Sequence, residues 1–349
     1  MSKPLYNLVS KDLLKEQLAQ EQITRKTISF YQYAHIVDAH AFRDELYSLL
    51  DEQQVYGRVY VSDEGVNAQI SVPNANVDKL RASLDTISFL RGIRLNMARE
   101  DDGKSFYKLK IKVKEKIVAD GLDDSSFDVT DKGTHVDAET FNKLADDPNT
   151  VIVDMRNHYE SEVGHFKGAI TPDVETFREE LPVVEDLLAD QKDKNILLYC
   201  TGGIRCEKAS AYYRHKGFKN VHQLEGGIIE YARQVQELGL ENKFVGKNFV
   251  FDERMGERIS TDIISSCHQC GVPCDTHANC NNDACHILFL QCKSCAQQYA
   301  DCCSNKCKDF VALPEEEQMR LKPRVIFNGM KLGKGRYKAH HKNDVLELE

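Results

Sequence analysis

The sequence predicts an α/β protein with several domains, and three patterns along the chain support this fold class. Residues 135–240 alternate short apolar strands with helical segments, which is typical of a parallel sheet covered by helices. Residues 1–125 follow the order strand–helix–strand–strand–helix–strand, which predicts a separate α+β domain. Ten of the twelve cysteines fall between 267 and 307, which predicts a small cysteine-rich module within 245–349. A chain of 349 residues has room for these domains.

Composition and charge limit the classes of function. The formal net charge is −9, so any binding of nucleic acid must depend on local basic patches. No apolar run approaches membrane-spanning length, and the first residues lack the apolar segment of a signal peptide. We therefore expect a soluble, cytoplasmic protein, in which twelve cysteines indicate metal or redox chemistry rather than disulfides.

The elements predicted for the first domain follow from apolar periodicity. We expect strands at 27–33, 57–62, 66–72 and 92–97, and helices at 39–52 and 76–87. This order is the ferredoxin-like pattern, which serves many functions and therefore predicts none.

A lysine-rich strand follows this domain pattern. Residues 106–116 alternate strictly, so Leu109, Ile111 and Val113 face one side. The other side carries the lysine strip, which we define as Lys108, Lys110, Lys112 and Lys114. The strip is either a contact surface for a phosphate backbone or an edge strand that lysines protect from aggregation.

Cys200 directly follows a predicted buried strand at 195–199, and a glycine-containing loop leads from Cys200 into a helix. Backbone N–H groups of such a loop can converge on the sulfur, and the helix dipole and Arg205 add positive charge. These effects favour the thiolate and make Cys200 a candidate nucleophile. The alternative is a buried structural cysteine.

The flanking segments fit the same site. Another strand ends in Asp154-x-Arg156, and a strand beginning at Asn220 runs into a Gly-Gly turn and a helix. Together, the motifs resemble those of the rhodanese domain over about residues 135–240: Asp154-x-Arg156, Gly164-His165, Cys200-x-x-Gly203-x-Arg205 and Leu224-x-Gly226-Gly227-Ile228.

The cysteine-rich module contains two CxxC pairs, Cys267-x-x-Cys270 and Cys292-x-x-Cys295. We expect these four residues to hold one zinc ion, and Cys280, Cys285, Cys303 and Cys307 to hold a second. Sites made only of thiolates are structural, so no metal catalysis is predicted here. A cluster of disulfides is the alternative.

The C-terminal segment 320–342 is basic. Its cationic residues are Arg320, Lys322, Arg324, Lys331, Lys334, Arg336, Lys338 and Lys342. Three glycines and the interleaved Phe327 and Tyr337 suggest a flexible tail that binds RNA and becomes ordered on contact. A disordered, solubilising tail is the alternative.

Over nearly its whole length, the chain resembles the bacterial tRNA uridine hydroxylases that contain a rhodanese domain. The stretches that carry this resemblance are 64–70, 154–160, 199–208 and 247–254. It implies oxygen-dependent hydroxylation at C5 of the wobble uridine (position 34) in the tRNA anticodon loop. It also implies that Cys200 and Cys206 are the site thiols, one of them by analogy a persulfide cysteine.

The predicted site combines both lines of reasoning. We expect Cys200, Cys206, Arg205, Asp154 and Arg156 to be catalytic, and Thr201, Gly202, Gly203 and the lysine strip to bind substrate. The expected partners are tRNA, molecular oxygen as co-substrate and structural zinc, with no membrane.

Enzymes that use oxygen normally need iron, copper or flavin, yet the sequence shows no two-His-one-carboxylate signal and no flavin or nicotinamide motif. The thiolate could instead add to C6 of uracil, or an oxidised cysteine could carry the oxygen. Two other classes remain open: a persulfide sulfurtransferase acting on tRNA or a carrier protein, and a noncatalytic RNA-binding zinc protein.

Overall fold

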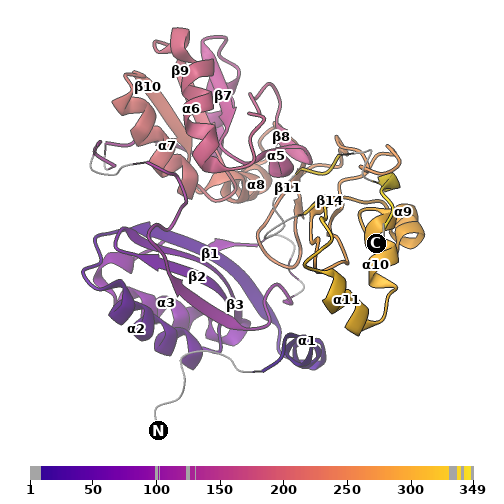
Figure 1. Cartoon of the computed structure of the whole chain (residues 1–349). Helices are drawn as coiled ribbons and strands as arrows, with labels where there is room; N and C mark the ends of the chain where they lie inside the picture. Colours follow the sequence, from indigo (N-terminus) through magenta and orange to yellow (C-terminus); the bar gives the residue numbers. More distant parts are fainter. Residues whose placement is uncertain are drawn as a thin grey trace.

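The computed structural model describes residues 9–98, 101, 103–122, 126–129, 131–329, 336–338 and 342–346. The helices of the first domain lie at one end of the molecule in Figure 1, and its sheet lies between these helices and the rhodanese domain. No helix in the described part of the chain is both long enough and apolar enough to span a membrane.

The first domain is a five-stranded sheet in the order β4-β1-β3-β2-β5. Its strands are β1 (Arg25–Tyr33), β2 (Tyr56–Ser62), β3 (Gly65–Pro73), β4 (Asn96–Met97) and β5 (Leu109–Val113). The first four strands pair antiparallel, and β5 joins the edge parallel to β2. The ferredoxin-like prediction is confirmed, although β4 and β5 are shorter than expected.

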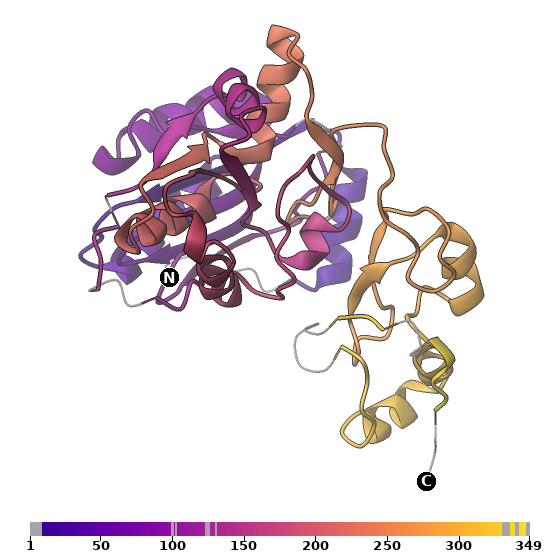
Figure 2. The same cartoon turned by 90° about the horizontal axis from the view of Figure 1, so that it is seen from above.

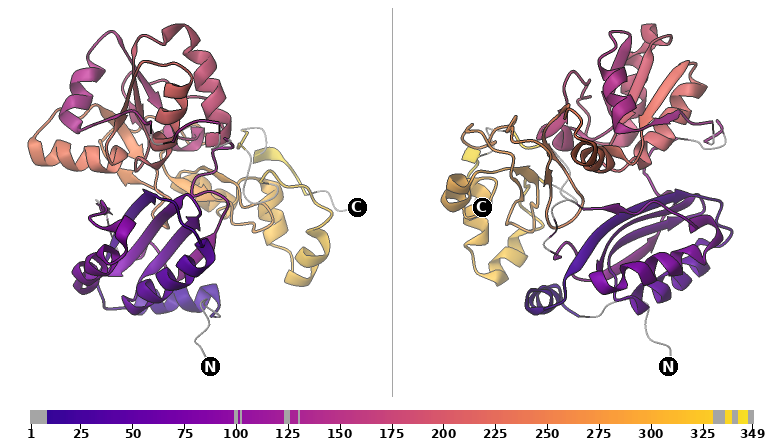
Figure 3. Two further views of the ribbon diagram at one scale, coloured as in Figure 1. Left: turned by 90° about the vertical axis from the view of Figure 1, so that its left-hand side faces the viewer. Right: turned by 180° about the vertical axis from the view of Figure 1, so that it is seen from behind.

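Helices cover only one face of this sheet. They are α2 (Ala39–Glu52) and α3 (Val77–Asp85), with the 3-10 turns η1 (Asn74–Asn76) and η2 (Ser88–Leu90). Ile28, Val59 and Ile70 point from the strands into the core beneath these helices. The opposite face, which carries the alternate side chains, lies towards the rhodanese domain (Figure 3). The helix α1 (Lys11–Gln20), which precedes the sheet, was not predicted.

The rhodanese domain has a parallel sheet in the order β6-β10-β9-β7. Its strands are β6 (Thr134–Val136), β7 (Thr150–Asp154), β9 (Asn195–Tyr199) and β10 (Asn220–Leu224). Its helices are α4 (Ala138–Ala145), α5 (His158–Ser161), α6 (Phe177–Leu187), α7 (Ile204–His215) and α8 (Gly227–Leu238), with the turn η3 (Ala189–Gln191). Residues of α6 and α7 pack on one face of the sheet, and residues of α4 and α8 pack on the other.

The cysteine-rich module lies to one side of the other two domains (Figure 2). A small sheet in the order β12-β11-β8 connects it to the rhodanese domain, made of β8 (Gly164–Phe166), β11 (Phe244–Asn248) and β12 (Glu257–Arg258). The module itself contains β13 (His277–Asn279), β14 (Leu288–Leu290), α9 (Lys293–Tyr299), α10 (Asn305–Val311) and α11 (Glu315–Leu321).

The expectation of a flexible basic tail is wrong for the part of 320–342 that the structure describes. Phe327 and Tyr337 are core residues of the module, because their aromatic surfaces are buried against its cysteines and Phe310. Arg336 is held by ion pairs with Asp173 and Glu175. Lys331 and Lys334 lie outside the described residues.

Candidate active site

Cys200 lies directly after β9, at the start of the loop that leads into α7. The backbone N–H of Gly203 donates a hydrogen bond to its sulfur over 3.1 Å. Burial raises the pKa of the Cys200 thiol. The Cys206 thiol, the Arg205 charge and the backbone N–H groups of Cys206 and Arg205 lower this pKa by more than burial raises it, and the net pKa is about 6. Cys200 is therefore mostly thiolate at neutral pH.

Cys206 lies on the first turn of α7, close to Cys200, but its pKa is shifted in the opposite direction. Burial and the neighbouring Cys200 thiolate raise the pKa of Cys206 well above its usual range. Cys206 therefore keeps its proton and donates its S–H towards Cys200. The two thiols form an asymmetric pair, with one nucleophile and one proton donor.

Arg205 is held by a buried carboxylate. Its guanidinium forms two parallel hydrogen bonds with Glu160 of α5, over 2.6 and 2.8 Å. The hydroxyl of Thr201 lies 3.3 Å from the same carboxylate. Glu160 thus fixes the loop from the rhodanese side, a role that sequence reasoning did not assign to it.

Two glycines are required by the shape of the loop. Gly203 adopts a left-handed conformation with φ of 98°, and a side chain there would meet the hydroxyl of Tyr31. Gly227 also has a positive φ, and its absent Cβ would lie 2.5 Å from the carbonyl oxygen of Cys200. The Gly-Gly turn therefore lets α8 begin directly against the Cys200 loop.

A cavity of about 380 Å³ opens beside Cys200 and lies between domains. The rhodanese loop contributes Cys200, Thr201, Gly202 and Arg205 to its lining. The uncovered face of the first domain's sheet contributes polar and aromatic side chains: Tyr31, Arg58, Tyr60, Asn67, Gln69 and Asn96. Part of the segment 250–257 completes the wall. A volume of this size suits a small organic ligand.

Polar contacts between α7 and the first domain hold the two walls of this cavity together. Lys208 Nζ lies 2.7 Å from a carboxylate oxygen of Glu64, in the turn between β2 and β3. The hydroxyl of Tyr31 donates to Glu207 over 3.3 Å. Since both partners on α7 follow Cys206 directly, the first domain is fixed against the helix that carries the site thiols.

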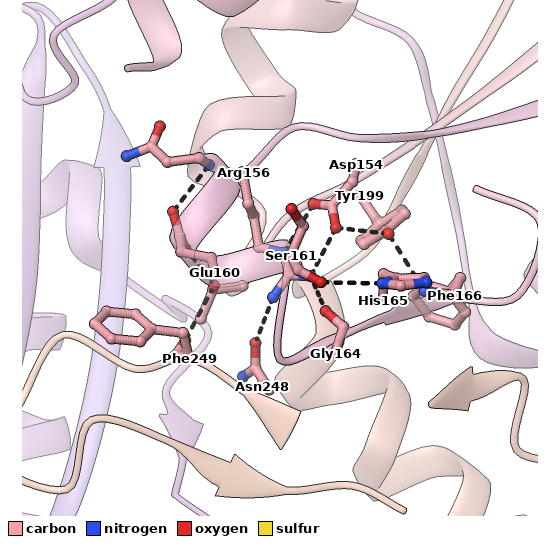
Figure 4. A network of polar contacts seen from close by, with 12 residues as sticks. Asp154, Arg156, Glu160, Ser161, Gly164, His165, Phe166, Tyr199, Asn248 and Phe249 are labelled. Atoms are coloured by element: carbon pink, nitrogen blue, oxygen red, sulfur yellow. Dashed lines mark hydrogen bonds and ion pairs between the residues drawn. The ribbon is translucent and has the colours of Figure 1, made fainter. Parts of the chain in front are cut away.

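Asp154 and Arg156 do not line this cavity. Both are fully buried, and Arg156 forms hydrogen bonds of 2.8 and 2.7 Å with the Asp154 carboxylate. Arg156 also donates to the carbonyl of Gly164 in β8, and Tyr199 donates to Asp154 (Figure 4). This network ties the ends of β7 and β9 to β8, so the geometry gives the pair a structural position.

The lysine strip follows the edge strand β5, with Lys110 and Lys112 in the strand and Lys108 and Lys114 directly before and after it, as both of its proposed roles require. Lys110, Lys112 and Lys114 are exposed, and Lys108 is half-buried. A groove of about 450 Å³ is lined by Lys108, Lys110 and the ring of Tyr107. Arg58 and Phe251 line both this groove and the Cys200 cavity. This groove, which carries lysines, aromatic rings and the carboxylates of Asp252 and Glu253, therefore continues into the candidate site.

The cysteine-rich module brings eight cysteines together in two groups of four. They are Cys267, Cys270, Cys292 and Cys295, and Cys280, Cys285, Cys303 and Cys307. Within each group, all sulfur atoms lie within 4.8 Å of one another. Four sulfurs at this separation match the donor set of a structural zinc site. Cys274 and Cys302 lie outside both groups.

Comparison with known proteins identifies the family. Three domain families match the chain: the UPF0176 acylphosphatase-like domain at residues 25–117, the rhodanese-like domain at 137–234 and the rhodanese C-terminal domain at 245–308. A protein of Pectobacterium atrosepticum named tRNA uridine(34) hydroxylase is 56% identical over 94% of this chain and 92% of its own length. A Yersinia pestis protein of the same name is 55% identical over the same shares.

The chain belongs to the tRNA uridine(34) hydroxylase family. Among solved structures, a rhodanese-like domain from Anabaena is 22% identical to it, with a TM-score of 0.26, over 32% of this chain and 78% of the other. The family assignment therefore depends on the full-length relatives.

Sequence reasoning missed the cavity wall that the first domain supplies. Asn67 and Gln69 alternate with apolar residues in β3, which was a readable signal of a polar sheet face. Asn96 lies in a strand of only two residues and gave no such signal. Because the wall forms only where two domains meet, no pattern local to either domain could predict it.

Proposed function

We propose that this protein hydroxylates C5 of uridine 34 in tRNA, with molecular oxygen as co-substrate, and that Cys200 carries out the chemistry. The observation that carries this proposal is the Cys200 thiolate in the wall of an interdomain cavity of about 380 Å³. Such a cavity suits a single nucleoside. The names of the full-length relatives support the substrate and the reaction.

The anticodon loop presents its bases without unpairing. A wobble uridine in a single-stranded loop can therefore enter the cavity at little energetic cost. The lysine strip and the groove beside Tyr107 would hold the flanking phosphates and bases. Because the protein carries a net charge of −9, such a local basic surface is needed to bind RNA.

Two routes start from the thiolate. In the first, the Cys200 sulfur bonds to C6 of uracil, which makes C5 nucleophilic towards an oxidant. Once C5 has gained oxygen, C5 loses its proton and the C6–S bond breaks, which restores the C5–C6 double bond and the thiolate. In the second, Cys200 is itself oxidised and passes the oxygen on. In both, one atom of O₂ enters the product and the other is reduced to water with two electrons. Joining the Cys200 thiolate and the Cys206 thiol in a disulfide would release two electrons and one proton, and the solvent would supply the second proton that the water needs.

Zinc would have a structural role. The two groups of cysteines fit tetrahedral zinc, and folding of a module this rich in thiols would depend on the metal. We place the protein in the cytoplasm, where the tRNA pool is found and thiols stay reduced.

The test is mass spectrometry of nucleosides from tRNA of cells that lack this gene. Loss of 5-hydroxyuridine and its derivatives at position 34 is the expected result. Loss of thiolated nucleosides instead would show that the protein is a persulfide sulfurtransferase. Restoration by the wild-type gene, but not by one encoding Cys200→Ser, would place the activity at this thiol.

A further inference from the structure

Two amide side chains of β3 form a directed chain of hydrogen bonds in the cavity wall. Asn67 and Gln69 both line the cavity that the Cys200 loop also lines, and both belong to the uncovered face of the first domain's sheet. The amide nitrogen of Asn67 donates to the carbonyl oxygen of Ile117 over 3.2 Å. The amide nitrogen of Gln69 donates to the side-chain oxygen of Asn67 over 2.6 Å.

The Ile117 carbonyl sets the direction of this chain. A carbonyl oxygen can only accept, so the group of Asn67 that faces Ile117 must be its NH₂ group. The Asn67 oxygen is then turned towards Gln69 and must accept from the Gln69 NH₂ group. Gln69 therefore presents its Oε1 as a fixed acceptor, and within the described residues no hydrogen bond occupies that atom.

A second acceptor in the same wall also lacks a partner. Asn96 is only 6% exposed, and its side-chain oxygen has no hydrogen-bond partner among the described residues. Its amide nitrogen lies 3.9 Å from the position that a Cβ on Gly202 would take, so Asn96 stands beside the Cys200 loop. A buried acceptor without a partner is costly unless a ligand donates to it. The wall is thus built for a ligand that carries N–H or O–H groups.

We propose that Gln69 reads the N3–H of the target uracil, and that the Ile117–Asn67–Gln69 chain makes the site select uridine over cytidine. Uracil has a donor at N3, whereas cytosine has an acceptor there. An amide free to flip could meet the base with either its oxygen or its nitrogen, whereas the contact with Asn67 keeps the Gln69 nitrogen at Asn67 and leaves Oε1, an acceptor, to meet a donor at N3. This inference rests on the proposed tRNA substrate and assigns the base-reading role to the first domain.

The test measures binding and does not depend on hydroxylation. In the Cys200→Ser background, the Kd values are compared for three anticodon stem-loop RNAs that carry uridine, cytidine or 3-methyluridine at position 34. We expect uridine to bind about 10-fold or more tightly than the other two, which is the discrimination typical of a specific base contact. Gln69→Met should abolish the difference by weakening only the uridine RNA.

A second variant and a matched control separate base reading from a general defect. Asn67→Leu leaves Gln69 in place but frees its amide, so binding of the cytidine RNA should approach that of uridine. Gln32→Met makes the same chemical change on β1, outside the cavity lining, and should preserve the preference. Thermal unfolding of each variant checks that it folds.

A preference for uridine that survives both Gln69→Met and Asn67→Leu in folded protein would overturn the inference, as would a wild-type cavity that does not distinguish the three RNAs. Failure of the proposed function would look different. In that case the wild-type protein would form no 5-hydroxyuridine, while the preference for the uridine RNA and its loss in the variants would persist.

Discussion

At the scale of single residues, the structure distinguishes the protonation states of Cys200 and Cys206, whereas the sequence indicated only that both are site thiols. The loop motif predicted a stabilised thiolate, and the pKa of about 6 agrees with that expectation. The motif could not show that Glu160 holds Arg205, because that contact joins α5 to α7 across 45 positions of sequence. Nor could it show that burial keeps Cys206 protonated.

The first prediction concerns the titration of Cys200. Its alkylation by iodoacetamide, followed by peptide mass spectrometry, should rise with pH, reach half of its maximum near pH 6 and level off above it, because only the thiolate reacts. Arg205→Met should move this midpoint upwards, since the Arg205 charge helps to lower the pKa. A wild-type midpoint near about 8.5, the value of a free thiol, would contradict the role of the loop.

At the scale of elements, the sequence predicted the boundaries of the regular segments well. The predicted helix at 39–52 and the predicted strand at 195–199 match α2 and β9. The strand at 92–97 was overextended, because only Asn96 and Met97 pair with β1. The three-stranded sheet of β8, β11 and β12 was missed, since its strands are short and are set by tertiary pairing.

The Asp154–Arg156 pair gives a prediction at this scale. Asp154→Asn would leave the Arg156 charge buried without its carboxylate, and breaking such a pair typically costs about 3–5 kcal/mol of the free energy of unfolding. Denaturant unfolding should show this loss. The alkylation midpoint of Cys200 should stay near pH 6. Full stability combined with loss of hydroxylation would instead give Asp154 the catalytic role that its motif suggested.

The lysine strip along β5 gives a second prediction at the scale of elements. Changing Lys108, Lys110, Lys112 and Lys114 together to Ala should weaken tRNA binding and reduce its salt dependence, by about one unit of slope for each lysine that contacts a phosphate. Filter-binding titrations across salt concentrations measure both quantities, and alkylation of Cys200 serves as the control. An unchanged slope would mean that the strip only protects an exposed edge.

At the scale of the whole molecule, the candidate site belongs to no single domain. The rhodanese loop supplies the thiolate, the first domain supplies the polar wall, and the segment leading to the cysteine-rich module closes the cavity. Sequence patterns described each part, and the expected grouping of the cysteines agrees with the two groups of four that the structure brings together, although spacing alone indicated only the two CxxC pairs. The cavity itself could not be predicted, because it depends on how the parts pack.

The cysteine-rich module gives a prediction at the scale of the whole molecule. Purified protein should contain about two zinc ions per chain by elemental analysis, since each group of four thiolates suits one ion. Cys267→Ser should lower the zinc content and the unfolding temperature. Cys302 is a buried cysteine outside both groups, so Cys302→Ser is the matched control and should keep both ions. Metal-free protein with all ten thiols of the module titratable in its native state would rule out this role.

The most direct test of the central claim is an isotope measurement in cells that lack the native gene and express variants of this protein. Cells are grown under ¹⁸O₂, and the masses of the nucleosides from their tRNA are measured by mass spectrometry. With the wild-type protein, 5-hydroxyuridine derivatives from position 34 should carry one ¹⁸O atom, and with Cys200→Ser they should be absent. Normal levels of these nucleosides with Cys200→Ser, or oxygen that comes from water, would contradict the account.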